Sequence, residues 1–252
     1  MQIEASSFDA AKVPSGTQSL AIHTIRKADL SRLQGLDRLA IDDLHLRWLS
    51  APDLTFVPLP PGLRGLTIMH SSRCKSLAGI TQAPGLRRLA WLDTGALSDF
   101  APLHDLPELE ELAIEGGMSS KQKVPALGQL AGLNLRRLTL RGVTGPDLAL
   151  DAVADMGGLQ DIDLHAIDFE PEDLAKVAAA RPDYYTQLKD LKDYPAGLGM
   201  KCKKCGGPRK ELFLKGLKWL WCPVCEAAGI EKALARFDAL VAAELDKRGD
   251  AA

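Results

Sequence analysis

The feature that most constrains this chain is a spaced leucine motif, L-x-x-L-x-L, which recurs along its first two thirds. Clear copies start at Leu36, Leu63, Leu86, Leu109, Leu135 and Leu159, and a degenerate copy starts earlier, at Thr17. Successive starts lie 19, 27, 23, 23, 26 and 24 residues apart. A single amphipathic helix would keep a 3.6-residue period without restarting. The pattern therefore predicts a repeating structural unit rather than a helical bundle.

The segment from about residue 15 to about residue 180 resembles the leucine-rich repeat family in this motif and in its spacing, since the repeats of that family are about 20–29 residues long. The resemblance implies an α/β solenoid, with a parallel β-sheet on the concave face and a mixed extended and helical convex side. Stacking of the repeats would supply the core, because one repeat cannot bury its own apolar face. The family's usual Asn or Cys, three residues after the third apolar residue, is missing. Its place is taken by Leu44, Ser71, Thr94, Gly117, Val143 and Ile167. We therefore expect no Asn ladder and an irregular coil.

The segments that return from one copy to the next change character along the chain. The late segments 145–158 and 170–183 read as helices, with Pro146 and Pro171 near their first turns. The earlier connections are rich in proline, which predicts extended chain. We expect a thin first half and a strand-helix second half.

The residues between the leucines should point to the concave face of the sheet. Read copy by copy, they are Arg38, Ala40, Asp42; Gly65, Thr67, Met69; Arg88, Ala90, Leu92; Glu111, Ala113, Glu115; Arg137, Thr139, Arg141; and Asp161, Asp163, His165. The middle position is Ala or Thr in five of these six copies, and charged residues flank it in alternating blocks. The plain interpretation is a solvated sheet face.

The functional interpretation of this face is a docking surface for a protein with complementary charges, since its carboxylates would repel a polyanion. The candidate partner-binding residues are Arg38, Asp42, Met69, Arg88, Leu92, Glu111, Glu115, Arg137, Arg141, Asp161 and His165.

Four of the five cysteines lie near the C-terminus, as Cys202-x-x-Cys205 and Cys222-x-x-Cys225. Two such pairs at this separation are typical of a zinc site, and the segment resembles the zinc-ribbon family over about residues 199–228. A hairpin turning at Lys215-Gly216 would bring both pairs together. Because all four ligands would come from protein, we expect a structural rather than a catalytic Zn²⁺. Iron is the alternative metal, since it also binds four thiolates.

The cysteine module is basic, whereas the rest of the chain is acidic. Residues 196–252 carry 11 Lys and Arg against 7 Asp and Glu, and the remainder carries 20 against 26. The lysines either offset the charge of a metal–thiolate centre or bind a phosphate backbone. The alternative function is therefore nucleic-acid binding through the basic ribbon, with Lys203, Lys204, Lys210 and Lys215 as its candidate residues and Trp219 or Trp221 as a stacking platform.

After the ribbon, apolar residues at helical spacing predict an amphipathic helix that covers the hairpin. Its predicted apolar stripe consists of Ile230, Ala233, Leu234, Phe237, Leu240, Val241 and Leu245. The alternative is that this apolar stripe lines a groove for a partner. We divide the chain into a solenoid (1–183), a cap and linker (184–198) and the ribbon with its helix (199–252).

No constellation of catalytic residues stands out, so we expect a non-enzymatic interaction module. Cys74 is a lone thiol, and its basic neighbours would lower its pKa, as in a nucleophilic cysteine. The favoured interpretation is a passive cysteine. The N-terminus lacks the charge and apolar core of a signal peptide, and no segment approaches about 20 apolar residues. We therefore expect a cytoplasmic protein, in which paired cysteines bind metal rather than form disulfides.

Overall fold

The computed structural model describes residues 1–193, 201–212 and 220–249. The chain divides into two compact units. The first unit comprises Met1–Leu148 and Met156–Leu164, and the second comprises Ala149–Asp155 and His165–Ala252. Among the helices in these ranges, none combines the length and the apolar character needed to cross a membrane.

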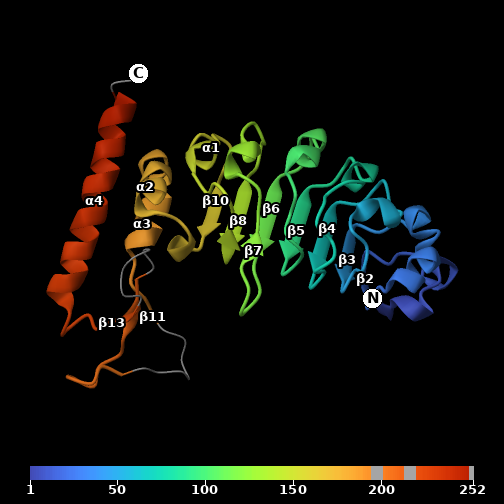
Figure 1. Cartoon of the computed structure of the whole chain (residues 1–252), viewed down its shortest axis with the longest axis horizontal. Coiled ribbons are helices and arrows are strands. Elements are labelled where there is room, and N and C mark those ends of the chain that lie inside the picture. Colours follow the sequence, from blue (N-terminus) through green and yellow to red (C-terminus); the bar gives the residue numbers. More distant parts are fainter. Residues whose placement is uncertain (194–200, 213–219, 250–252) are drawn as a thin grey trace. The chain divides into compact units, whose positions relative to one another are not determined.

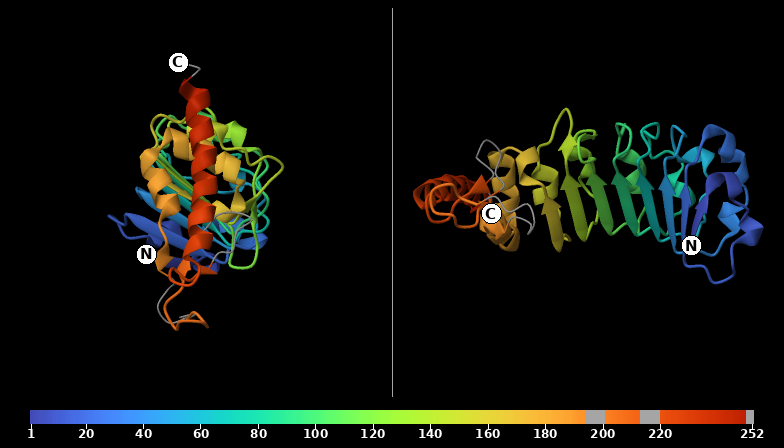
Figure 2. Two further views of the ribbon diagram at one scale, coloured as in Figure 1. Left: turned by 90° about the vertical axis from the view of Figure 1, so that its left-hand side faces the viewer. Right: turned by 90° about the horizontal axis from the view of Figure 1, so that it is seen from below.

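The first unit is built on an eight-stranded parallel sheet whose strands follow one another in chain order (Figures 1 and 2). Its strands are β1 (Gln2–Glu4), β2 (Ser19–His23), β3 (Asp43–Arg47), β4 (Gly65–Met69), β5 (Arg88–Leu92), β6 (Glu111–Glu115), β8 (Arg137–Arg141) and β10 (Asp161–Leu164). A separate parallel pair is formed by β7 (Gln122–Lys123) and β9 (Val143–Thr144). The edge strand β1 carries no leucine motif, and the sequence analysis did not predict it.

Alternation along each strand decides which side chains form the core. In β3, Leu44 and Leu46 are fully buried, whereas Asp43, His45 and Arg47 are half-buried on the opposite face. Leu44 pairs with Leu66 and Leu46 with Ile68, and the same register continues strand by strand to β10. The second and third apolar residues of every copy therefore stack into two continuous buried rows, as side chains of period two require.

One predicted copy is in the wrong frame. Leu36–Arg38 forms a 3₁₀ turn, which begins after Gly35 in a left-handed conformation (φ 86°), and the strand starts only at Asp43. A second frame, Ile41-x-x-Leu44-x-Leu46, overlaps the first and matches the strand. This frame starts 24 residues after Thr17 and 22 before Leu63, which is more regular than the spacing first assigned.

The predicted return segments are confirmed only in part. The early connections contain 3₁₀ turns rather than extended chain alone, for example Leu54–Phe56 and Ile80–Gln82. The helix expected across 145–158 is reduced to α1 (Asp151–Ala154). The helix expected across 170–183 is present as α2 (Pro171–Ala180), with Pro171 in its first turn.

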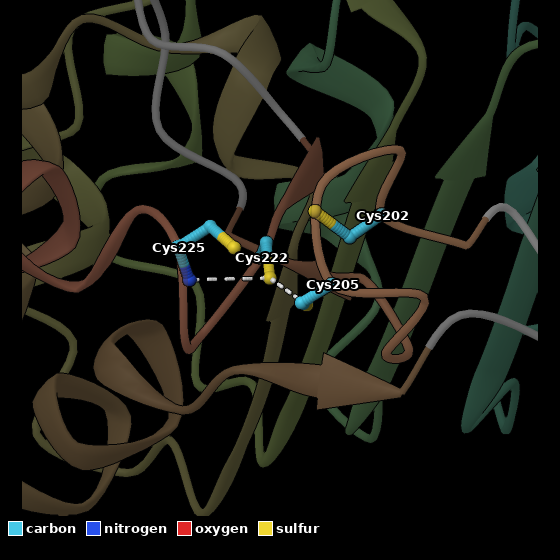
Figure 3. A group of neighbouring side chains, drawn as sticks. All are labelled: Cys202, Cys205, Cys222 and Cys225. Carbon is cyan, nitrogen blue, oxygen red and sulfur yellow. Dashed lines mark hydrogen bonds between the residues drawn. The ribbon is translucent and has the colours of Figure 1, made fainter.

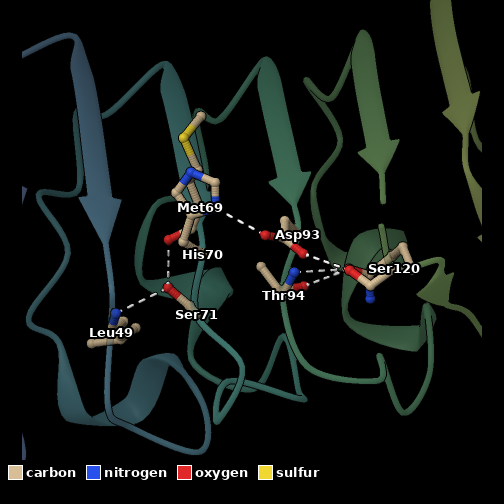
Figure 4. Close-up of polar contacts among 8 residues, drawn as sticks. Leu49, Met69, His70, Ser71, Asp93, Thr94 and Ser120 are labelled. Carbon is tan, nitrogen blue, oxygen red and sulfur yellow. Dashed lines mark hydrogen bonds and ion pairs between the residues drawn. The ribbon is translucent and has the colours of Figure 1, made fainter. Parts of the chain in front are cut away.

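Polar side chains tie neighbouring copies of the motif together. The Ser71 hydroxyl accepts a hydrogen bond from the Leu49 amide at 3.0 Å and donates one to the Met69 carbonyl at 2.9 Å (Figure 4). The buried Gln122 accepts from the Thr94 amide and donates to the Gly95 carbonyl. Bridges of this kind satisfy backbone groups that are buried between two turns of the chain.

The second unit contains helices and a small antiparallel sheet. Its further elements are α3 (Pro182–Lys189), β11 (Lys192–Asp193), β12 (Lys210–Glu211), β13 (Leu220–Trp221) and α4 (Ala227–Gly249). Helix α2 packs against α4, and the Tyr185 hydroxyl donates to Asp238 of α4 at 2.5 Å. The predicted C-terminal helix is present: Ile230, Ala233, Phe237 and Val241 are buried, whereas Leu245 is exposed. Within the described residues it packs mainly on α2 rather than on the hairpin that it was expected to cover.

The inter-copy bridge at Ser71 gives a test of the fold. Replacing Ser71 by Ala leaves the buried Leu49 amide without its acceptor. We expect the free energy of unfolding, measured by urea denaturation, to fall by about 1–3 kcal/mol. The neighbouring Ser72 is exposed, so the control Ser72→Ala should change the free energy of unfolding by less than about 0.5 kcal/mol. Equal effects of the two substitutions would contradict the bridge.

Candidate functional site

The four C-terminal cysteines lie together in the second unit (Figure 3). Their Sγ atoms are all within 4.8 Å of one another, and those of Cys205 and Cys222 are 3.6 Å apart. The antiparallel pairing of β12 with β13 explains the gathering, because the first pair precedes β12 and the second follows β13. The predicted hairpin is thus confirmed at its base, while its expected turn at Lys215-Gly216 lies outside the described residues.

Each cysteine pair sits in a tight turn that aims both thiols inward. The Gly206 amide donates to the Cys202 carbonyl at 2.8 Å, and the Cys202 amide donates to the Gly207 carbonyl at 2.9 Å. Gly206 adopts a φ of 71°, which a residue with a side chain rarely takes. In the second turn the Cys225 amide donates to the Cys222 sulfur at 3.3 Å.

The arrangement fits a tetrahedral metal ion. Zn–S bonds of about 2.3 Å place sulfurs about 3.8 Å apart, close to the 3.6 Å between Cys205 and Cys222 and within the 4.8 Å limit of the cluster. Amides of Cys205 and Lys204 lower the pKa of the Cys202 thiol to about 6. The hydrogen bond with Cys205, followed by desolvation, raises the pKa of Cys225 to about 12. Four thiolates at this distance need a cation between them, and a cation with four sulfur ligands has no open position for a substrate.

Glu226 is a residue at this site that the sequence analysis missed. Its carboxylate accepts a hydrogen bond from the Cys222 amide at 2.7 Å, and its own amide donates to the Cys222 carbonyl at 3.0 Å. It therefore fixes the turn that carries Cys222 and Cys225, and hydrogen bonds of this kind orient the ligands of metal sites. The signal in the sequence was its position directly after a C-x-x-C pair, at the start of a helix.

The lysines around the cysteines differ in exposure. Lys201, Lys203 and Lys204 are exposed, whereas Lys210 is half-buried in β12. Lys215 and Trp219 lie outside the described ranges. The Trp221 ring lies against Gly229 at the start of α4, so this aromatic side chain packs within the module.

The second candidate site is the outer face of the parallel sheet, opposite the buried rows. We define its three rows by the strand register. The first row is Asp43, Gly65, Arg88, Glu111, Arg137 and Asp161; the middle row is His45, Thr67, Ala90, Ala113, Thr139 and Asp163; the third row is Arg47, Met69, Leu92, Glu115 and Arg141. A depression of about 220 Å³ lies over the first two rows.

Charges in the first row pair with one another. Arg88 reaches across β4 to Asp43 at 2.7 Å, which is possible because Gly65 has no side chain there. Arg137 contacts Glu111 at 3.5 Å and Asp161 at 2.8 Å. The alternating charge blocks seen in the sequence therefore largely pair with one another, both between neighbouring strands and across β4.

Three of the predicted partner-binding residues lie outside the strands. Arg38 is in the 3₁₀ turn before β3, and Asp42 precedes β3 and pairs with Arg64 at 3.8 Å. His165 follows β10, with its Nδ1 3.3 Å from Asp168. Arg38 and Asp42 were misplaced because the motif at Leu36 was read in the wrong frame. The same error left out His45 and Arg47, which occupy the outer face of β3. Burial lowers the pKa of His45, which favours the neutral imidazole.

The outer face carries the remaining predicted partner-binding residues, which are Met69, Arg88, Leu92, Glu111, Glu115, Arg137, Arg141 and Asp161.

Cys74 lacks the surroundings of a nucleophile. It is fully buried in the first unit. Burial and, secondarily, the nearby Asp53 raise the pKa of its thiol to about 12, so the thiolate is scarce at neutral pH. The prediction that basic neighbours lower the pKa of Cys74 is therefore wrong.

Metal removal should unfold the cysteine turns alone. We expect mass spectrometry of the intact chain to detect a single bound metal ion, and chelation to raise amide hydrogen exchange in residues 201–212 and 220–226. Exchange in β3–β6 should stay unchanged, because those strands share no ligand with the cluster.

Single substitutions test whether the four clustered cysteines, and not Cys74, bind the metal. Cys222→Ser should abolish stoichiometric metal binding, since it removes one of the four thiolates. Cys74→Ala should retain the metal, because Cys74 lies outside the cluster. Metal content that survives Cys222→Ser, or falls equally in both variants, would contradict a four-thiolate site.

The chain matches no protein-family model, no curated protein and no solved structure. A function for it must therefore be argued from its own residues, above all from four clustered thiols and an accessible face of parallel sheet.

Proposed function

We propose that this chain is a non-enzymatic interaction module that binds a protein partner along the outer face of its parallel sheet. In this proposal the sheet belongs to a leucine-rich repeat solenoid, and the outer face is its concave side. The cysteine cluster is a zinc ribbon that holds a structural Zn²⁺.

The accessible outer face carries the proposal. Parallel sheets are usually covered on both faces. Here the middle-row residues Thr67, Ala90, Ala113 and Thr139 remain partly exposed, while the opposite face is filled by leucines. Because the side chains of this middle row are small, another chain can approach the backbone of the sheet closely.

The charges of this face favour a protein over a polyanion. Arg88 and Arg137 already contact carboxylates, so neither offers an unpaired cation to a phosphate. Glu111, Asp161 and Asp163 would repel a nucleic-acid backbone. A protein can match both signs of charge along the rows, and complementary charges fix the register of an interface.

The proposed zinc site has a structural role. The small sheet β11–β12–β13 has only two residues in each strand, and so short a sheet needs a cross-link to persist. A Zn²⁺ bound by four thiolates supplies that cross-link. All five cysteines are free of disulfides, which suits a reducing compartment such as the cytoplasm.

Nucleic-acid binding is the second candidate. It is favoured by the exposure of Lys201, Lys203 and Lys204 beside the cysteines. The two candidates differ in the surface that contacts the partner, so an experiment that reports on position can separate them.

Photo-crosslinking in the cells that make the protein tests the proposal. A photoreactive amino acid at Ala90 would probe the middle row, and one at Thr81 would probe an exposed position in a connecting turn. We expect the Ala90 variant to form a discrete protein adduct that resists nuclease, and the Thr81 variant to form none.

Identical adducts from Ala90 and Thr81, or none from Ala90, would overturn the proposal. A nuclease-sensitive complex that depends on Lys203 and Lys204 would instead favour nucleic-acid binding by the cysteine module.

A further inference from the structure

An exposed tryptophan stands where strand β3 ends. Trp48 follows Arg47 directly, and half of its surface is accessible (50%). Its backbone is left-handed, with a φ of 55°, which is rare for a bulky residue. The Trp48 amide donates to the Met69 carbonyl on the next strand at 3.0 Å, which holds this conformation in place.

The strands on both sides of β3 each place a ring near this indole. The His70 ring, after β4, is stacked on Trp48 with centroids 5.9 Å apart. The His23 ring, at the end of β2, lies at 6.2 Å in a tilted arrangement. His70 is fixed in turn, because its Nδ1 lies 3.0 Å from the Asp93 carboxylate, which also accepts from Ser120 (Figure 4).

Two apolar residues of the outer face end the next two strands, directly before His70 and Asp93. Met69 and Leu92 are opposite each other in the register of β4 and β5, and both are half-buried. Trp48, Met69 and Leu92 are thus accessible apolar residues at the C-terminal ends of β3, β4 and β5, and we call them the Trp48 surface. Exposed tryptophans of this kind are common anchors of protein interfaces.

Three cations at or after the C-terminal ends of the strands lack the pairing found in the first row. Arg47 ends β3, Lys27 lies four residues after β2, and Arg73 lies four residues after β4. None of the three forms an ion pair within the part of the chain that the structure describes. Of the nearby carboxylates, Asp93 is engaged by His70 and Ser120, and Asp53 accepts from Thr55. Glu115 bounds the surface on the β6 side.

We infer that the Trp48 surface is the anchor point for an acidic protein segment with a large apolar side chain. The apolar side chain packs on Trp48, Met69 and Leu92, and the carboxylates of the segment pair with Lys27, Arg47 and Arg73. This inference rests on the proposed function, and it names the partner chemistry and the end of the sheet at which the partner is held.

The geometry favours a peptide over a single-stranded nucleic acid. A base needs a free aromatic face on which to stack, but the His70 ring already stacks on the Trp48 indole and the tilted His23 ring lies close to it. The exposed part of Trp48 is therefore suited to lateral apolar contact. Asp93 and Glu115 would also repel a phosphate backbone.

Selection from a random linear peptide library on the immobilised full-length chain tests the inference. We expect the selected peptides to combine Asp or Glu with Trp, Phe, Leu or Ile. Trp48→Gly should weaken their binding at least tenfold without loss of fold, since glycine accepts a φ of 55° without strain. Phe56→Ala is the matched control, because Phe56 is equally exposed (51%) and should leave binding unchanged. The double variant Arg47→Glu and Arg73→Glu should also weaken binding at least tenfold.

The other outcomes separate the two proposals. Peptides that bind Trp48→Gly normally but are lost when Ala90 is replaced by Trp would overturn the Trp48 anchor and leave the outer-face function standing. Failure to select any peptide, together with no adduct at Ala90, would overturn both. An oligo(dT) probe that binds the wild type and not Trp48→Gly would replace the acidic segment with a nucleic acid.

Discussion

The structure of the first unit depends on the burial of two apolar rows that no single strand could bury alone. Leu44 and Leu46 acquire a core only when Leu66 and Ile68 lie beside them in register, and the same holds at each step to β10. Each fully buried leucine contributes about 1.5–3 kcal/mol through removal of apolar surface from water. Because the contribution arises between neighbours, the register of one strand fixes the register of the next.

The other features of the sheet follow from this register. Residues that alternate with the leucines must face outward, which places Arg88 beside Glu111 and Arg137 between Glu111 and Asp161. The residues directly after β3, β4 and β5 turn away sharply: Trp48, His70 and Asp93 have positive φ, and their amides donate to carbonyls of the next strand. Thr24, directly after β2, also has a positive φ. Parallel stacking thus brings Trp48, His70 and Asp93 together, although they lie more than twenty residues apart in sequence.

Much of this organisation could be predicted from the sequence. Spacing alone predicted the copies from Leu63 to Leu159, and the cysteine pattern predicted the cluster that the structure shows. The frame at Leu36 failed because two overlapping motifs share Ile41, and the pattern cannot tell which one forms the strand. The decision is made by pairing with Leu66 and by the turn at Gly35. Trp48 gave no signal, since its role depends on a backbone conformation and on ring contacts across strands. Zinc and the protein partner stay predictions.

The most direct test of a binding function for the outer face is oxidative footprinting of the chain, alone and in complex with the protein crosslinked at position 90. In the free chain, Trp48 and the fully exposed Met118 should be oxidised, and the buried Trp91 should be protected. In the complex, we expect oxidation of Trp48 and Met69 to fall several-fold, while Met118 and Phe56 stay reactive. Unchanged oxidation of Trp48 and Met69, or protection of Phe56 and Met118 instead, would contradict binding through this face.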